Sequence, residues 1–140
     1  IGYPFGLNAK NAGFNLLFRP SQTEYGLFPT AVIAARESWL KEPKNRKVAV
    51  EFLRALNEGL QLARENAAVT KRALRKFTRT NDDASLQGSF EYYKDAFPSS
   101  LRVVEKAMTN ALKFVDHPKA KQYDVRQSFD NSYVDEAMKQ

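Results

Sequence analysis

Glycine and proline are unevenly spaced along this chain of 140 residues, and their spacing limits which elements can form. Seven of them interrupt the first 35 residues every few positions: Gly2, Pro4, Gly6, Gly13, Pro20, Gly26 and Pro29. Because either residue ends or bends regular structure, only short elements fit between them. From Arg36 onward the breaks are rare and apolar residues recur with the period of a helix. We therefore expect two segments, a strand-and-loop segment over residues 1–35 and a helical segment over 36–140.

The first segment contains two short apolar runs, residues 14–18 and 31–35, each bounded by turn residues. Runs of this length between breakers are typical of buried strands. A brief helix is expected over residues 8–12. Because two short strands do not form a self-sufficient sheet, these strands must pair with each other or with strands outside the chain.

Five longer helices are expected in the second segment. Pro43 suits the first turn of a helix whose apolar residues are Val48, Phe52, Leu56, Leu60 and Ala63. The later helices are expected to begin at Asn66, at Asp82 or Asp83, at Ser99 or Ser100, and after Asp130 or Asn131. In the third helix an aromatic core stripe contains Phe90, Tyr93 and Phe97, while Tyr92 points elsewhere. The sequence thus predicts a mostly helical α/β fold with five helices and two or so short strands.

Composition excludes several kinds of site. The chain has no cysteine, which rules out disulfides, thiolate metal sites and a cysteine nucleophile. It has one histidine. Of the 22 Lys+Arg and 16 Asp+Glu, residues 1–70 hold 9 and 6, and residues 71–140 hold 13 and 10, so each half has a net charge of +3. The positive excess is concentrated only at Lys71, Arg72, Arg75, Lys76 and Arg79, which fits the solvated face of a helix.

Few groups are suited to catalysis. His117 precedes Pro118 in a turn, and we interpret it as solvent-facing. The adjacent Asp82 and Asp83 are explained by helix capping and the helix dipole. The loop over residues 2–6 contains two glycines and Pro4, and a loop that presents its N–H groups at a helix start can hold an anion or a polar ligand head; it is equally an ordinary turn. We expect no catalytic residue, metal or cofactor.

The order of these parts resembles a known family. The chain has a proline-containing loop, then Ala9-Lys-Asn-Ala-Gly13-Phe14, a polar stretch ending in Leu27-Phe-Pro-Thr30, an apolar run, and a helix from Pro43 through Gly59. Its end, Phe129-Asp-Asn-Ser-Tyr-Val-Asp-Glu-Ala137, is similar to the family's closing helix entry. Together these resemble the C-terminal half of a periplasmic substrate-binding protein of an ABC importer, of the nitrate, sulfonate, taurine or thiamine-precursor type.

The resemblance implies a two-lobed type II periplasmic-binding-protein fold that holds a small solute in the cleft between its lobes. Residues 1–35 would then belong to the inter-lobe region and residues 36–140 to the helical part of one lobe. The missing N-terminal half would supply the other strands and most ligand contacts. Gly2, Tyr3 and Phe5 are the ligand-binding residues that the resemblance implies, and Tyr25 is a weaker candidate. Tyr3 stands where the family usually has an acidic or aromatic residue.

The expected function is therefore non-enzymatic: capture of an anionic or aromatic solute and its delivery to an inner-membrane permease. The expected location is the periplasm, or the extracellular side with a lipid anchor, after export through a signal outside this chain. We expect a fragment of this kind to self-associate and not to bind nucleic acid. Two alternatives stay open, an enzyme that resembles thiamine-pyrimidine synthases and a basic helical module that binds nucleic acid or protein. The sequence does not name the solute.

Overall fold

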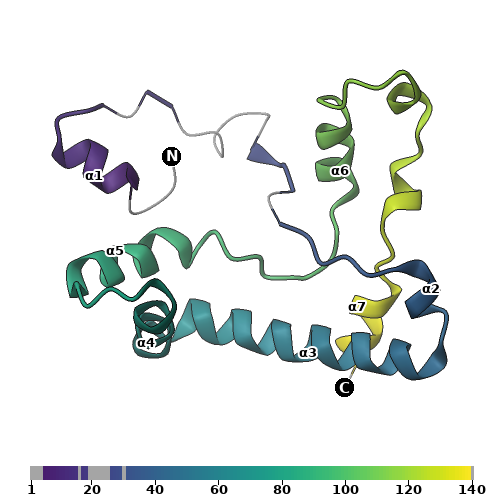
Figure 1. The fold of residues 1–140 in the computed structure, drawn as a ribbon, viewed down its shortest axis with the longest axis horizontal. Helices are drawn as coiled ribbons and strands as arrows, with labels where there is room; N and C mark the ends of the chain where they lie inside the picture. The colour runs from purple at the N-terminus through teal and green to yellow at the C-terminus, as the bar shows by residue number, and fades with distance from the viewer. Residues whose placement is uncertain (1–4, 16, 19–25, 30, 140) are drawn as a thin grey trace. The chain divides into compact units, whose positions relative to one another are not determined.

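The computed structural model describes residues 5–15, 17–18, 26–29 and 31–139, and every regular element in these ranges is helical (Figure 1). The chain divides into two compact units. Unit 1 contains residues 1–17 and 55–100, and unit 2 contains residues 18–54 and 101–140. The longest helix, α3 (Pro43–Glu65), contributes to both, because the division falls between Arg54 and Ala55.

Unit 1 contains helix α1 (Phe5–Asn11), the second half of α3, α4 (Ala67–Thr78) and α5 (Asp83–Tyr93). Asn66 caps α4, since its side-chain oxygen accepts the backbone N–H of Val69 at 3.0 Å. Asp82 caps α5 in the same way. Gly13 follows α1 with a φ of +87°, a conformation that glycine adopts without steric cost.

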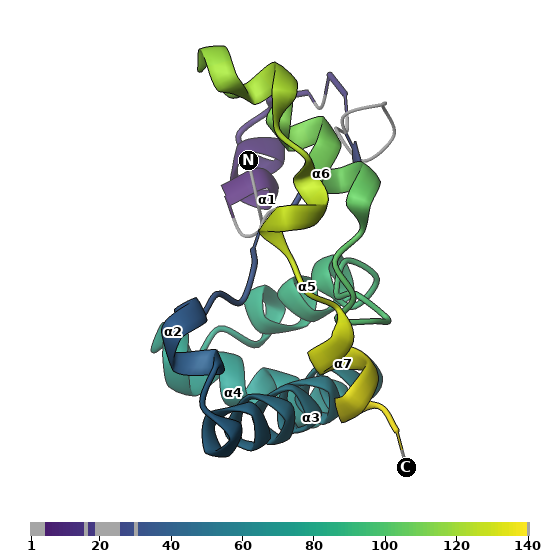
Figure 2. The same cartoon turned by 90° about the vertical axis from the view of Figure 1, so that its right-hand side faces the viewer.

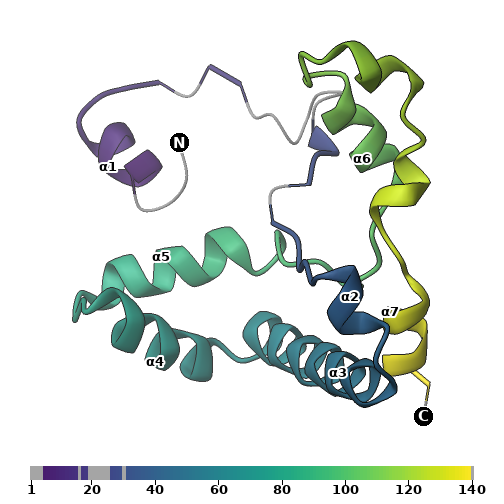
Figure 3. The ribbon, with the colours of Figure 1, turned by 45° about the vertical axis from the view of Figure 1, so that its right-hand side comes forward.

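Helices α4 and α5 lie side by side in unit 1 (Figures 1 and 3). Their core contains Leu86, which is 1% exposed, and Phe90. Thr70 is buried too, and its hydroxyl donates a hydrogen bond to the Ala63 carbonyl at 2.9 Å. That bond satisfies a polar group that would otherwise be costly to bury. It also ties the start of α4 to the end of α3.

Unit 2 contains α2 (Glu37–Leu40), the first half of α3, α6 (Glu105–Leu112) and α7 (Ser132–Ala137). Between α6 and α7 the chain makes two 3₁₀ turns, η3 (Pro118–Gln122) and η4 (Val125–Ser128). Helix α6 lies beside η4 (Figure 2). The buried side chains of this unit are small: Val50, Ala107, Val125, Val134 and Ala137.

The buried face of α3 in unit 2 differs from the predicted one. Val50 is 4% exposed, whereas Val48 and Phe52 are 56% and 51% exposed. The side chains at 46 and 54, one helical turn on either side of Val50, bond to α7. Contact with α7 therefore decides which face of α3 is buried, and the predicted apolar positions 48 and 52 remain outside the core.

The predicted α/β class is wrong for the described chain, which contains helices and no strand. Residues 31–35 have no regular secondary structure, and Val32 and Ile33 are more than 60% exposed. Phe14, Leu17 and Phe18 are exposed as well. A strand forms only when a neighbouring strand takes up its backbone hydrogen bonds, and the described residues provide no such neighbour. The expectation that the chain is mostly helical is confirmed.

Most, but not all, of the predicted helix starts are confirmed. The starts at Pro43, Asn66 and Asp82, and the last helix after Asn131, are confirmed. The start at Ser99 or Ser100 is wrong, because α6 begins at Glu105. The Val103 N–H donates to the Asn131 side chain instead of joining a helix. None of the described helices is both long enough and apolar enough to span a bilayer.

Candidate functional site

The predicted ligand-binding residues lie mostly outside the described ranges. Gly2, Tyr3 and Tyr25 belong to that undescribed part. Phe5 is the first residue of α1, and its side chain is 69% exposed. The described part of the chain therefore shows no ligand site built from these four residues, and their role stays a prediction.

The residues that were considered for chemistry have structural partners. His117 is exposed, and its Nδ1 accepts the Lys119 N–H at 3.2 Å, which caps η3. Asp82 accepts N–H groups from Ala84 and Ser85, both at 3.2 Å, and the Ser85 hydroxyl. The Ser85 hydroxyl, followed by the Ser85 N–H, lowers the pKa of Asp82 below its ordinary value. The neighbouring Asp83 pairs with Arg75, so the two carboxylates do not act as a dyad.

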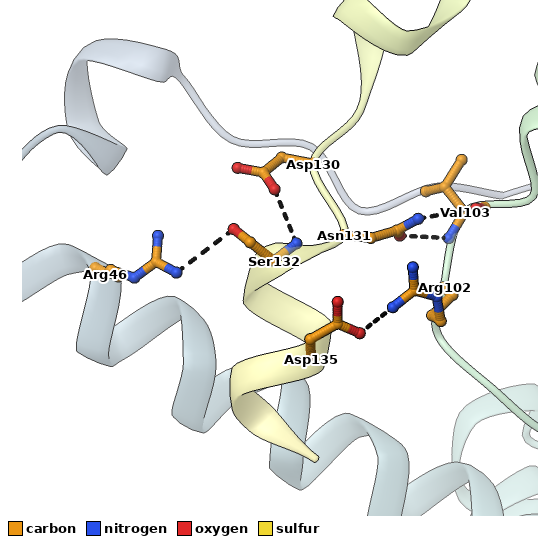
Figure 4. Close-up of polar contacts among 7 residues, drawn as sticks. All are labelled: Arg46, Arg102, Val103, Asp130, Asn131, Ser132 and Asp135. Atoms are coloured by element: carbon orange, nitrogen blue, oxygen red, sulfur yellow. Dashed lines mark hydrogen bonds and ion pairs between the residues drawn. The ribbon is translucent and has the colours of Figure 1, made fainter. Parts of the chain in front are cut away.

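A set of polar contacts holds α7 in unit 2, and we call it the α7 anchor: Arg46, Arg54, Arg102, Val103, Asp130, Asn131, Ser132, Tyr133, Asp135 and Glu136. Figure 4 shows its members other than Arg54, Tyr133 and Glu136. The Arg46 Nε donates to Glu136 at 2.8 Å. The same guanidinium lies 4.2 Å from the centre of the Tyr133 ring, a cation–π distance. The Arg54 Nε donates to the Ala137 carbonyl at 3.2 Å, and Arg102 pairs with Asp135.

Asn131 binds the backbone of Val103 through both polar atoms of its amide (Figure 4). Its side-chain oxygen accepts the Val103 N–H at 2.8 Å, and its side-chain nitrogen donates to the Val103 carbonyl at 3.1 Å. This pair of bonds occupies both backbone groups of Val103. An asparagine amide is the neutral side chain that offers a donor and an acceptor in this geometry.

The α7 anchor has no group poised for acid–base chemistry. Its carboxylates are paired with arginines or cap the helix, as Asp130 does when it accepts the Ser132 N–H at 2.8 Å. Hydrogen bonds from Ser132, the hydroxyl first, lower the pKa of Asp130. Catalytic acids and bases instead need a pKa near the working pH. We conclude that these contacts position α7.

Unit 1 contains an apolar groove, which we call the α3/α4 groove, lined by Gly59, Leu62, Ala63, Val69, Thr70, Ala73, Leu74, Phe77 and Phe97. Its volume is about 260 Å³. Phe77 is 81% exposed at its edge. The Lys76 Nζ lies 5.8 Å from the centre of the Phe77 ring, so a cation accompanies this aromatic side chain.

A second hollow in unit 1 has a volume of about 480 Å³ and a more polar lining that includes Arg64, Lys94 and Ser99. Both cations there are engaged. The Arg64 Nη1 donates to the Pro98 carbonyl at 3.1 Å, and the Lys94 ammonium pairs with Glu91 at 2.6 Å. This hollow therefore offers no unpaired charge from these two residues to a ligand. No set of three or more His, Cys, Asp and Glu side chains in the described ranges is placed to hold a metal ion.

Sequence reasoning missed both the α7 anchor and the groove. The anchor joins residues up to 90 positions apart, so no local spacing in the sequence predicts it. The groove had a weak local signal, because Val69, Ala73 and Phe77 fall on one face of a helix and the cations on another. That pattern does not tell whether the apolar face is covered. Comparisons of this chain with protein-family models, with curated proteins and with solved structures find no match.

Proposed function

We propose that this chain is part of the solute-binding component of an ABC importer, in which it helps to hold a small anionic or aromatic solute for delivery to an inner-membrane permease. The observation that carries the proposal is the order of the sequence features, from the loop at residues 2–6 to the closing segment 129–137. The proposed location is the periplasm or the outer face of a membrane. The protein acts without an enzymatic step.

Two features of the described chain support this proposal. Helix α3 begins at Pro43, and α7 lies within 129–137, as the resemblance implies. In addition, the segment that precedes α2 exposes Val32 and Ile33, and the segment after α1 exposes Phe14, Leu17 and Phe18. Exposed apolar side chains in such number favour a covering surface. A further part of the binding protein would be such a surface.

The test measures solute binding by the full gene product that contains this chain. Isothermal titration with nitrate, taurine, an alkanesulfonate and an aminopyrimidine should find one solute that binds at a single site. Phe5→Ala or Tyr25→Ala should then weaken that binding at least tenfold, because each removes an aromatic contact. Phe77→Ala is the matched control, since it removes another exposed phenylalanine outside the proposed ligand site.

Two results would contradict the proposal. One is the absence of binding to any member of the panel by a folded protein. The other is binding that neither Phe5→Ala nor Tyr25→Ala alters. Cell fractionation gives a separate check, because a solute-binding protein should be found outside the cytoplasm and a cytoplasmic protein would not serve an importer.

A further inference from the structure

Several apolar side chains that line the α3/α4 groove are exposed in the described part of unit 1. Leu62 on α3 is 46% exposed and Phe77 on α4 is 81% exposed, and both line the groove. Ala73, which also lines it, is exposed as well. Covering large apolar side chains removes them from water, which is favourable. A partner that covers these side chains therefore has a driving force available.

The α3 side of this groove has an acidic rim. Glu58 and Glu65 lie four residues before and three residues after Leu62, so all three side chains share one face of the helix. Both glutamates are exposed. Within the described ranges, neither carboxylate takes part in an ion pair. Their charge is available to a partner.

The α4 side has a basic rim. Arg72 lies three residues after Val69, and Lys76 lies three residues after Ala73, so each cation adjoins a residue that lines the groove. Both are exposed, and neither is in an ion pair with another described residue. Acidic side chains thus adjoin the part of the groove that α3 lines, and basic side chains adjoin the part that α4 lines.

We propose that the α3/α4 groove is the interface between two copies of this chain, related by a two-fold axis. A two-fold interface brings the same patch of both copies together and so requires a patch that complements itself. Here the acidic rim of one copy meets the basic rim of the other, while Phe77 and Leu62 of each copy enter the partner's groove. This proposal does not depend on the proposed solute-binding function.

The opposite charges of the rims disfavour other occupants. An anionic membrane surface or a nucleic acid would be attracted by Arg72 and Lys76 but repelled by Glu58 and Glu65. A uniformly acidic peptide would meet the same repulsion. A second copy satisfies both rims at once. Since exposed charges contribute to it, the dimer should be sensitive to salt.

The experiment uses the whole chain and two charge-changed variants. Glu58→Lys with Glu65→Lys makes both rims basic, and Arg72→Glu with Lys76→Glu makes both rims acidic. Sedimentation equilibrium at low salt should show a monomer–dimer equilibrium for the unchanged chain. Each variant alone should dimerise at least tenfold more weakly, because like charges then face each other. An equimolar mixture should recover dimer affinity to within about threefold, because opposite rims meet again.

The mixture also shows whether a variant has simply failed to fold, because an unfolded chain cannot restore the dimer. Phe77→Ser should weaken the dimer at least fivefold, whereas Phe18→Ser, at another exposed phenylalanine in unit 2, should leave the dimer unchanged. The proposal is overturned if the unchanged chain is monomeric at all concentrations, or if the mixture associates no better than either variant. Binding of the unchanged monomer to phosphatidylserine vesicles would also overturn it.

Discussion

Among the described residues, side-chain bonds inside unit 2 reach further along the chain than those inside unit 1, where the bond from Arg64 to Pro98 spans 34 positions. In unit 1 the side-chain bonds that fix α4 and α5 are local: Asn66 to Val69, Thr70 to Ala63 and Arg75 to Asp83. In unit 2 Arg46 bonds to Glu136 across 90 positions, and Asn131 bonds to Val103 across 28. Local bonds form as the helices form, whereas distant ones require closure of long loops, which costs chain entropy.

Their cores differ as well. Unit 1 buries two large side chains, Leu86 and Phe90, while the buried apolar side chains of unit 2 are valines and alanines. Because apolar stabilisation scales with buried area, the core of unit 1 contributes more per residue. Unit 2 relies more on satisfied polar groups. The following substitutions test this contrast, from the largest expected effect to the smallest.

Leu86→Ala should destabilise unit 1 by about 2–5 kcal/mol, because it removes a fully buried side chain and leaves a cavity. Urea unfolding, monitored by circular dichroism, measures the loss. Leu17→Ala is the matched control, since Leu17 is 90% exposed and its truncation should change the unfolding free energy by less than about 0.5 kcal/mol. Equal losses at both positions would contradict the assignment of the core.

Asn131→Ala should destabilise unit 2 by about 1–3 kcal/mol, because it leaves the half-buried N–H and carbonyl of Val103 without their partners. Amide hydrogen exchange should show faster exchange in α7 and unchanged exchange in α5. Asn57→Ala is the control, because the Asn57 side chain makes no hydrogen bond in the described part of the chain. Faster exchange in α5 as well would mean that the two units open together.

Arg79→Gly should stabilise unit 1 by about 1 kcal/mol. Arg79 ends α4 with a φ of 56°, in the left-handed region where a side chain is strained and glycine is not. The urea midpoint should therefore rise. Gly13→Ala is the reciprocal test, since Gly13 has a φ of +87° and an added Cβ there should lower the midpoint. A fall in stability for Arg79→Gly would show that this arginine makes a contribution that outweighs the strain.

The pH dependence of unit 2 gives the smallest expected effect. The folded pKa of Asp130 lies below its ordinary value, 3.8, so its carboxylate contributes stability above that value. The contribution is lost as the pH falls through the lower, folded pKa. Asp130→Asn should reduce the difference in unfolding free energy between pH 7 and pH 2 by less than about 0.5 kcal/mol, because solvent screens this exposed group.

Local chemistry made the helix starts at Pro43, Asn66 and Asp82 predictable, whereas α5 ends at Tyr93 and not at Phe97 as expected. Asn66 and Asp82 fix helix starts through side-chain hydrogen bonds that span three residues or fewer. Pro43 suits the first turn of α3, which begins there. The predicted strands failed for the opposite reason. An apolar run between breakers specifies a strand only when a partner strand is present, and the described residues contain none.

The candidate site was less predictable than the fold. Three of the four predicted ligand residues lie outside the described ranges, and Phe5 is an exposed residue at the start of α1. The charges that border the α3/α4 groove are visible in the sequence as Glu58, Glu65, Arg72 and Lys76. Which of them lie beside the groove is not, because that depends on the turn of the chain at Asn66, between α3 and α4.

The sequence by itself determined where α3, α4 and α5 begin, because capping and proline geometry act within one turn of a helix. It also determined that His117 and Asp82 are turn and cap residues. Only the tertiary structure decided that Val50 is buried while Val48 and Phe52 are exposed, and that residues 101–104 precede α6. Whether a side chain of a helix is buried depends on which distant segment packs against that helix. For α3 that segment is α7, some 90 residues away along the chain.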